Sequence, residues 1–224
     1  MPVMDEQGHA RVTAAVAEAE LHTSGEIVTV ISDRSDSYAD VALAWAAGLS
    51  FTVLTLLAIF PAIPLGLVAS IYGTWNPEWL PADIFGTAAA IGIVTFLLAA
   101  LAQLWDPLRF FLVPGVIKTQ RAEARAVDLF KVGAERRTHG RTGVLIYLSM
   151  REHRAEIVAD QPIAEKVDPE VWGAAMADML REIRQGRIAD GLAAGVRDVG
   201  AILSEHFPRA EDDRNELPDR LIEL

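Results

Sequence analysis

The stretch HTSGEIVTVISD, His22 to Asp33, contains the end of a helix, a turn and a short strand. Residues 27–31 are apolar or β-branched on both faces, which is typical of a strand inside a sheet rather than at its edge. Such a strand needs neighbours, because a buried strand without pairing is unfavourable. The chain does not supply one at once, since a long uncharged run follows.

Two uncharged runs interrupt an otherwise charged chain of 224 residues, the first from Val41 to Pro77 and the second from Ile84 to Trp105. A helix needs about 20 apolar residues to cross the hydrocarbon core of a bilayer, so each run is long enough for one span. Pro61 and Pro64 are expected at the outer end of the first span or at a kink there. The alternative is a pair of buried core helices, but uncharged runs of this length are rare in soluble domains.

The distribution of Lys and Arg predicts an orientation for these spans. The connecting loop, residues 74–83, has neither residue type, whereas Arg109, Lys118, Arg121 and Arg125 follow the second run. The positive-inside rule then places the loop outside and both the N- and C-termini in the cytoplasm.

The charged parts of the chain carry helix and strand patterns on both sides of the hairpin. Apolar spacing predicts helices over residues 5–22, 118–138, 169–185 and 188–206, and strands over 144–148 and 154–159. Gly25 is expected to end the first helix in a left-handed conformation. Since both ends of the hairpin return to one side of the membrane, residues 27–31 can pair with residues 144–148. The prediction is therefore one α/β domain, residues 1–40 and 106–208, split by a membrane hairpin at 41–105 and followed by a charged, flexible tail at 209–224.

Three stretches of this domain resemble one family. Thr23-Ser24-Gly25-Glu26 resembles the opening of the TPM domain (the DUF477 group), residues 143–157 resemble its central β-hairpin, and residues 186–192 resemble its closing helix junction. With the inserted hairpin, the chain resembles the membrane subgroup found in the bacterial inner membrane. The resemblance implies an α/β/α sandwich around a small sheet.

Members of this family gather acidic side chains at one end of the sheet, where a metal can bind. The corresponding and neighbouring acids here are Glu26, Asp33, Asp36, Glu152, Asp160 and Asp168. The resemblance implies a site for Ca²⁺ or Mg²⁺, cations that take carboxylate oxygens as ligands. The sequence departs from the family pattern in the hairpin turn, where Glu152-His153 replaces Asp-Arg. Each acid also has a simpler role, such as a helix cap for Asp168 or a solvated loop for Asp33 and Asp36.

Composition excludes several classes of protein. The net charge of −11 argues against a nucleic-acid binder, and the absence of cysteine excludes disulfides and thiolate chemistry. The five histidines show no zinc-binding spacing, and the sequence has no P-loop. Two hypotheses remain: a non-catalytic interaction or quality-control module for other membrane proteins, and a metal-dependent phosphatase, an activity ascribed to some members of the family. A transport role is disfavoured, because pathways through the membrane usually carry ionisable residues.

Overall fold

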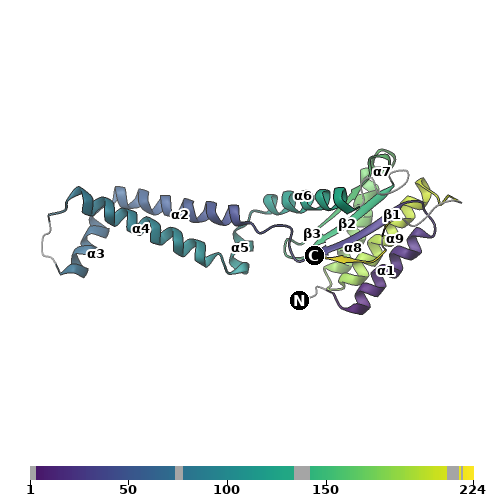
Figure 1. Cartoon of the computed structure of the whole chain (residues 1–224), viewed down its shortest axis with the longest axis horizontal. Coiled ribbons are helices and arrows are strands. Elements are labelled where there is room, and N and C mark those ends of the chain that lie inside the picture. Colours follow the sequence, from purple (N-terminus) through teal and green to yellow (C-terminus); the bar gives the residue numbers. More distant parts are fainter. Residues whose placement is uncertain (1–3, 74–77, 134–141, 211–216, 218) are drawn as a thin grey trace. The chain divides into compact units, whose positions relative to one another are not determined.

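The computed structural model describes residues 4–73, 78–133, 142–210, 217 and 219–224. The chain forms two compact units (Figure 1). Residues 1–36 and 115–224 form the first, here called the sheet unit, and residues 37–114 form the second, here called the hairpin unit.

A four-stranded sheet forms the centre of the sheet unit. Its order is β3 (Arg154–Ala159), β2 (Gly143–Ser149), β1 (Glu26–Ser32) and β4 (Ile222–Glu223). β1 and β2 are parallel and pair along seven residues, while β2 and β3 form an antiparallel hairpin. The predicted pairing of residues 27–31 with 144–148 and the interior position of β1 are therefore confirmed.

Helices cover both faces of this sheet. Helices α1 (Glu6–Glu20), α8 (Pro169–Ile183) and α9 (Ile188–His206) lie on one face and α6 (Gly115–Gly133) lies on the other (Figure 1). The alternation of β1 side chains explains both cores: Ile27 and Ile31 enter the first, and Val28 and Val30 enter the second. The predicted α/β/α sandwich is confirmed, and a short helix that the sequence did not suggest, α7 (Gln161–Lys166), follows β3.

Glycines set how closely α9 approaches its neighbours. A Cβ atom on Gly191 would lie 2.8 Å from the backbone oxygen of Met179 in α8, and one on Gly200 would lie 2.6 Å from the Cβ of Ala19 in α1. Gly25 has the same kind of role, since a Cβ there would lie 2.9 Å from a methyl group of Leu203. The prediction of a left-handed Gly25 is wrong: among the described residues the only left-handed glycines are Gly73 and Gly186.

Described residues at the end of the predicted flexible tail, residues 209–224, pack on the sheet. Ile222 and Glu223 form β4, which runs parallel to β1, and the side chains of Leu217 and Leu221 are only 6% and 5% exposed. Burial of these leucines stabilises a segment whose charged composition suggested a loose end.

The hairpin unit contains α2 (Ala39–Ile59), α3 (Ala62–Tyr72), α4 (Pro81–Ala102) and α5 (Asp106–Leu112). The break between α2 and α3 falls at Phe60-Pro61, where the prolines predicted it. Helices α2 and α4 are long and apolar enough to cross a membrane. They pack on each other, and the buried Ser50 hydroxyl donates a hydrogen bond of 2.9 Å to the Gly92 carbonyl.

Helix α5 belongs to the hairpin unit, although its residues were assigned by sequence to the following domain. The Trp45 indole donates to the Leu112 carbonyl at 3.1 Å. The Arg109 guanidinium donates to the carbonyls of Gln103 and Ser37 at 2.8 and 3.3 Å. These bonds attach α5 to the ends of α2 and α4. The expected helix stop at His139-Gly140 lies outside the described residues.

One buried polar atom among the described residues has no partner, the hydroxyl oxygen of Thr29 in β1. An unpaired buried hydroxyl costs about 1–3 kcal/mol, whereas valine has nearly the same shape. We expect Thr29→Val to raise the free energy of unfolding of the sheet unit by about 1 kcal/mol, measured by amide hydrogen exchange of β1 and β2 in detergent micelles. Thr29→Ser keeps the hydroxyl and removes a methyl group, so this control should lower stability. Equal loss in both variants would contradict the prediction.

Candidate functional site

A buried carboxylate lies at the edge of the sheet where β1 and β2 end. Glu152 sits in the turn between β2 and β3 and is 3% exposed. Its two oxygens accept a short hydrogen bond from the Ser149 hydroxyl and a bond of 2.8 Å from the Ser35 amide. Glu152 therefore joins the loop after β1 to the hairpin after β2.

The same edge holds a second link between the two connections. The Ser35 hydroxyl lies 3.0 Å from the hydroxyl of the fully buried Tyr147, and the Arg151 amide donates to the Asp33 carbonyl at 3.0 Å. These serine and tyrosine partners were not identified from the sequence. Their only signal is position, because Tyr147 and Ser149 lie near the end of a buried strand and Ser35 follows the strand beside it.

Arginines pair with the two aspartates of this edge. The Arg151 guanidinium lies 3.0 Å from the Asp33 carboxylate, and the Arg121 guanidinium lies 3.2 Å from the Asp36 carboxylate. Both pairs are solvent-accessible, so their contribution to stability is small. Together with Glu152, these residues form a polar network, here called the Glu152 edge, in which each acid already has a hydrogen-bond or ion-pair partner.

Two other predicted acids lie at the opposite edge of the sheet. Glu26 begins β1 and accepts a bond of 3.1 Å from the Leu217 amide. Asp160 follows β3 and accepts a bond of 3.0 Å from the Gly143 amide, at the start of β2. Both side chains are 5% exposed. Their contacts fix the first residues of the strands, which is a structural role for each.

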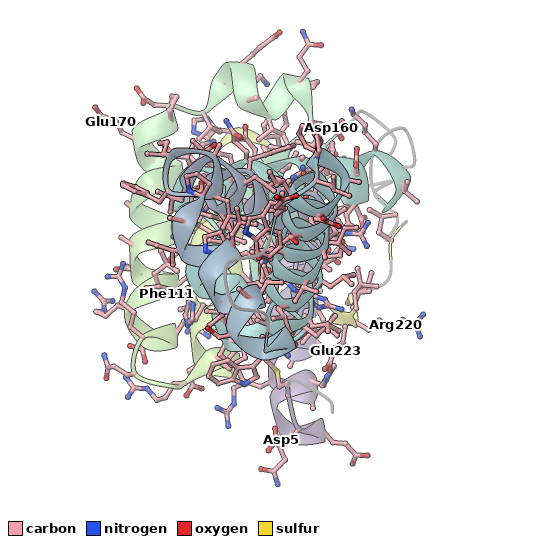
Figure 2. The ribbon with its side chains drawn as sticks, turned by 90° about the vertical axis from the view of Figure 1, so that its left-hand side faces the viewer. Asp5, Phe111, Asp160, Glu170, Arg220 and Glu223 are labelled. Atoms are coloured by element: carbon pink, nitrogen blue, oxygen red, sulfur yellow. The ribbon has the colours of Figure 1, made fainter. Side chains whose placement is uncertain are left out.

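The sixth predicted acid, Asp168, is the N-cap of α8 and accepts a bond of 2.9 Å from the Glu170 amide. Figure 2 shows Glu170, at the start of α8, well apart from Asp160. The helix-cap role proposed for Asp168 from sequence is present in the structure.

The six acids therefore occupy three places rather than one. Among the described residues, no group of three or more His, Cys, Asp or Glu side chains is arranged to hold a metal ion. The nearest approach to the family's acidic cluster is the Glu152 edge, with Asp33, Asp36 and Glu152. Ligation of Ca²⁺ or Mg²⁺ by any of these residues stays a prediction.

Glu156 in β3 makes stability depend on pH. Partial burial raises the pKa of its carboxyl above the ordinary value of 4.5, Glu123 raises it further, and Arg154 lowers it in part. The folded chain therefore holds this proton more tightly than the unfolded chain. The contribution of this proton to the free energy of unfolding is greatest below pH 4.5, and it is lost as the pH rises through the pKa of Glu156 in the folded chain.

We expect Glu156→Gln to stabilise the sheet unit at pH 7, by less than about 1 kcal/mol because the carboxyl is half-exposed and screened by solvent. The gain should shrink as the pH falls towards 4.5 and below, because the wild-type carboxyl is then protonated. Hydrogen exchange of β2 and β3 measured between pH 4 and pH 8 checks this, after correction for the intrinsic exchange rate. A difference that does not vary with pH would assign the effect to packing instead.

Comparison with known proteins agrees with this architecture. The family model described as the TPM domain matches residues 103–202. The NMR structure of the BA42 protein from the psychrophilic bacterium Bizionia argentinensis is similar in fold, with a TM-score of 0.55 and 17% sequence identity over 99% of this chain and 96% of the other. Curated protein sequences give no match. Residues 1–36, which precede the matched range, supply α1 and β1 to the same sheet. Residues 103–202 thus match the TPM domain, and the chain is similar in fold to the BA42 protein.

Proposed function

We propose that this chain is a membrane-anchored interaction module, in which a two-span hairpin holds the TPM domain at the cytoplasmic surface of the bacterial inner membrane. The observation that carries the proposal is the surface of α2 and α4. In each helix, only 6% of the most apolar 18-residue segment is buried. Large side chains such as Phe51, Phe85 and Leu98 are more than 60% exposed. Exposed apolar surface of this extent is explained by contact with lipid.

Aromatic side chains support the same proposal. Trp45 and Trp105 lie near the first residues of α2 and after the last residues of α4, and both are about half-exposed or more, at 49% and 66%. Phe111 in α5 is 83% exposed. Tryptophan concentrates at the interface between lipid and water, so these positions suit one end of a membrane hairpin. Trp75, at the other end of the hairpin, lies outside the described residues.

The interaction role is favoured over catalysis because the polar groups of the Glu152 edge bond to one another. The Glu152 carboxylate accepts hydrogen bonds from the Ser35 amide and the Ser149 hydroxyl. None of the described histidines takes part in this network of hydrogen bonds. These hydrogen bonds hold the loop after β1 and the turn between β2 and β3 in place. The partners that we expect are other membrane proteins, contacted by a domain held close to the bilayer.

The test begins with location. The full chain should remain in the membrane fraction after washing with alkaline carbonate, and reporters fused after Leu224 and within residues 78–83 should give cytoplasmic and external signals respectively. Release by carbonate or a cytoplasmic loop signal would contradict the anchoring or the orientation.

Function is tested by cross-linking in cells followed by purification in mild detergent. We expect membrane proteins to co-purify with the wild-type chain and not with the hairpin unit alone. The competing function is a metal-dependent phosphatase. Hydrolysis of p-nitrophenyl phosphate that requires Mg²⁺ or Ca²⁺ and is lost in Asp33→Asn, a variant of an exposed side chain, would contradict a purely non-catalytic module.

A further inference from the structure

The described residues of the C-terminal segment, 217 and 219–224, lie along the side of β1 that faces away from β2. β2 pairs with all seven residues of β1, but β4 pairs only with Val30 and Ile31. The Leu224 amide extends this contact by donating to the Ile31 carbonyl at 3.0 Å. At the other end of β1, the Leu217 amide donates to the Glu26 carboxylate at 3.1 Å. The segment therefore follows β1 from its first residue to its last.

Two leucines anchor the segment, one in each core of the sheet unit. Leu217 packs in the core beneath α6, and Leu221 packs in the core beneath α1 and α9. Ile222 packs beside the α6 core, and the Glu223 carboxylate lies 3.0 Å from the ring of His9. The side of β1 that faces away from β2 thus offers an apolar contact on each face of the sheet and a polar contact with His9.

Main-chain pairing holds this segment at only a few points. At the start of β1, the Ile27 amide donates to the Glu20 carboxylate at 2.9 Å, so a side chain takes the place of a neighbouring strand. Each hydrogen bond contributes about 1 kcal/mol net. Even with the Asp33 amide donating to the Leu224 carbonyl at 3.3 Å, β4 makes fewer main-chain bonds than β2, so we expect it to open before β2 does.

We propose that the edge beside β1 is a docking groove for an extended segment of a partner protein, and that residues 217 and 219–224 occupy it as an internal competitor. A partner would add a strand parallel to β1, with main-chain bonds for affinity and two apolar pockets for specificity. The segment that now fills the groove defines the chemistry of the occupant. It carries apolar residues at the places of Leu217, Leu221 and Ile222, and an acid facing His9. This inference rests on the proposed interaction role and assigns it a surface.

The experiment uses the full chain in detergent micelles and, as the probe, a fluorescein-labelled peptide with the sequence of residues 217–224. The double variant Leu217→Asp/Leu221→Asp should release the internal segment, because a buried carboxylate without a partner is costly. We expect the peptide to bind this variant at least tenfold more tightly than it binds the wild-type chain, by fluorescence anisotropy. A peptide with both leucines replaced by Asp should not bind either chain.

Arg220→Ala provides a matched control in the same segment. Arg220 is exposed and points away from the fold (Figure 2), so this variant should keep the segment docked and bind peptide as weakly as the wild-type chain does. Hydrogen exchange of β2 reports whether each variant keeps its fold. If the double variant unfolds, Leu221→Ala replaces it, with the same requirement of tighter peptide binding than in the wild-type chain.

Two results would overturn the groove: no peptide binding to a folded, released variant, or equal binding to the released variant and to Arg220→Ala. Co-purification separates this outcome from failure of the proposed function. If the released variant binds peptide but no membrane protein co-purifies with it, the result supports the docking groove and contradicts the proposed interaction role. If membrane proteins co-purify equally with the wild-type and released chains while peptide binds neither, the interaction role stands and uses another surface.

Discussion

Gly191→Val should lower the free energy of unfolding of the sheet unit by about 3 kcal/mol, the upper part of the range for overpacked cores. The new Cβ would lie 2.6 Å from a side-chain carbon of Ile183 and 2.8 Å from the Met179 carbonyl oxygen. The Ile183 side chain could move aside, but the Met179 carbonyl belongs to the backbone of α8. Helix α9 must therefore shift away from α8, which disturbs the core that both helices share with β1 and β2.

Amide hydrogen exchange of β2 in the full chain, held in detergent micelles, measures this loss. Gly173→Ala is the matched control, because Gly173 lies in α8 with nothing within 4 Å of a Cβ atom placed on it. Alanine there removes the conformational freedom of glycine in a helix and should raise stability by about 0.5–1 kcal/mol. If both substitutions had the same effect, close packing between α8 and α9 would not be what requires Gly191.

Glu152→Ala is expected to cost about 3 kcal/mol, because a buried donor and a partly buried donor lose the acceptor that satisfies them. The Ser149 hydroxyl and the Ser35 amide both bond to this carboxylate, and Ser149 is fully buried. The loss should appear first as faster hydrogen exchange in the loop after β1 and in the turn between β2 and β3. Glu152→Gln keeps an oxygen for Ser35 and should cost about 1 kcal/mol, the net value of one hydrogen bond.

A double-mutant cycle tests whether the two side chains act together. Ser149→Ala removes the hydroxyl that donates to Glu152, so Ser149→Ala/Glu152→Ala should cost clearly less than the sum of the two single variants. Additive losses would show that Glu152 stabilises the fold by other contacts. Phosphatase activity that disappears in Glu152→Gln while hydrogen exchange stays unchanged would instead favour the catalytic hypothesis.

The central strands and the hairpin could be predicted because their signals are strong and local. The β-branched run of β1, the apolar run of β2 and the uncharged lengths of α2 and α4 are visible in single windows of sequence. β4 was missed because its stabilising residues form no run of strand length: Leu217 lies between an acid and a proline, and Leu221-Ile222 is only two apolar residues. These leucines are buried because they pack beside β1, which lies almost two hundred residues earlier in the chain. A pattern within a short window of sequence cannot indicate such a distant contact.

The placement of the acids could be predicted in part from topology. The loops after two parallel strands meet at one edge, which puts Asp33 and Glu152 together. Because β3 runs antiparallel to β2, its end returns to the other edge, and Asp160 therefore lies beside Gly143, which pairs with Glu26. Pairing of Asp33 and Asp36 with arginines was not predictable, since Arg121 and Arg151 reach these acids from different elements.

The position of the hairpin between β1 and β2 also governs the order in which this protein can form during synthesis. Glu26 pairs with Gly143, so the ribosome must add more than a hundred residues, including both apolar helices, before β1 meets its partner. At about 5–20 residues per second, β1 waits for roughly 6 to 23 seconds. Throughout that interval an aggregation-prone strand is shielded only by α1 or by a chaperone. If the hairpin is inserted into lipid as proposed above, that insertion precedes the closure of the domain.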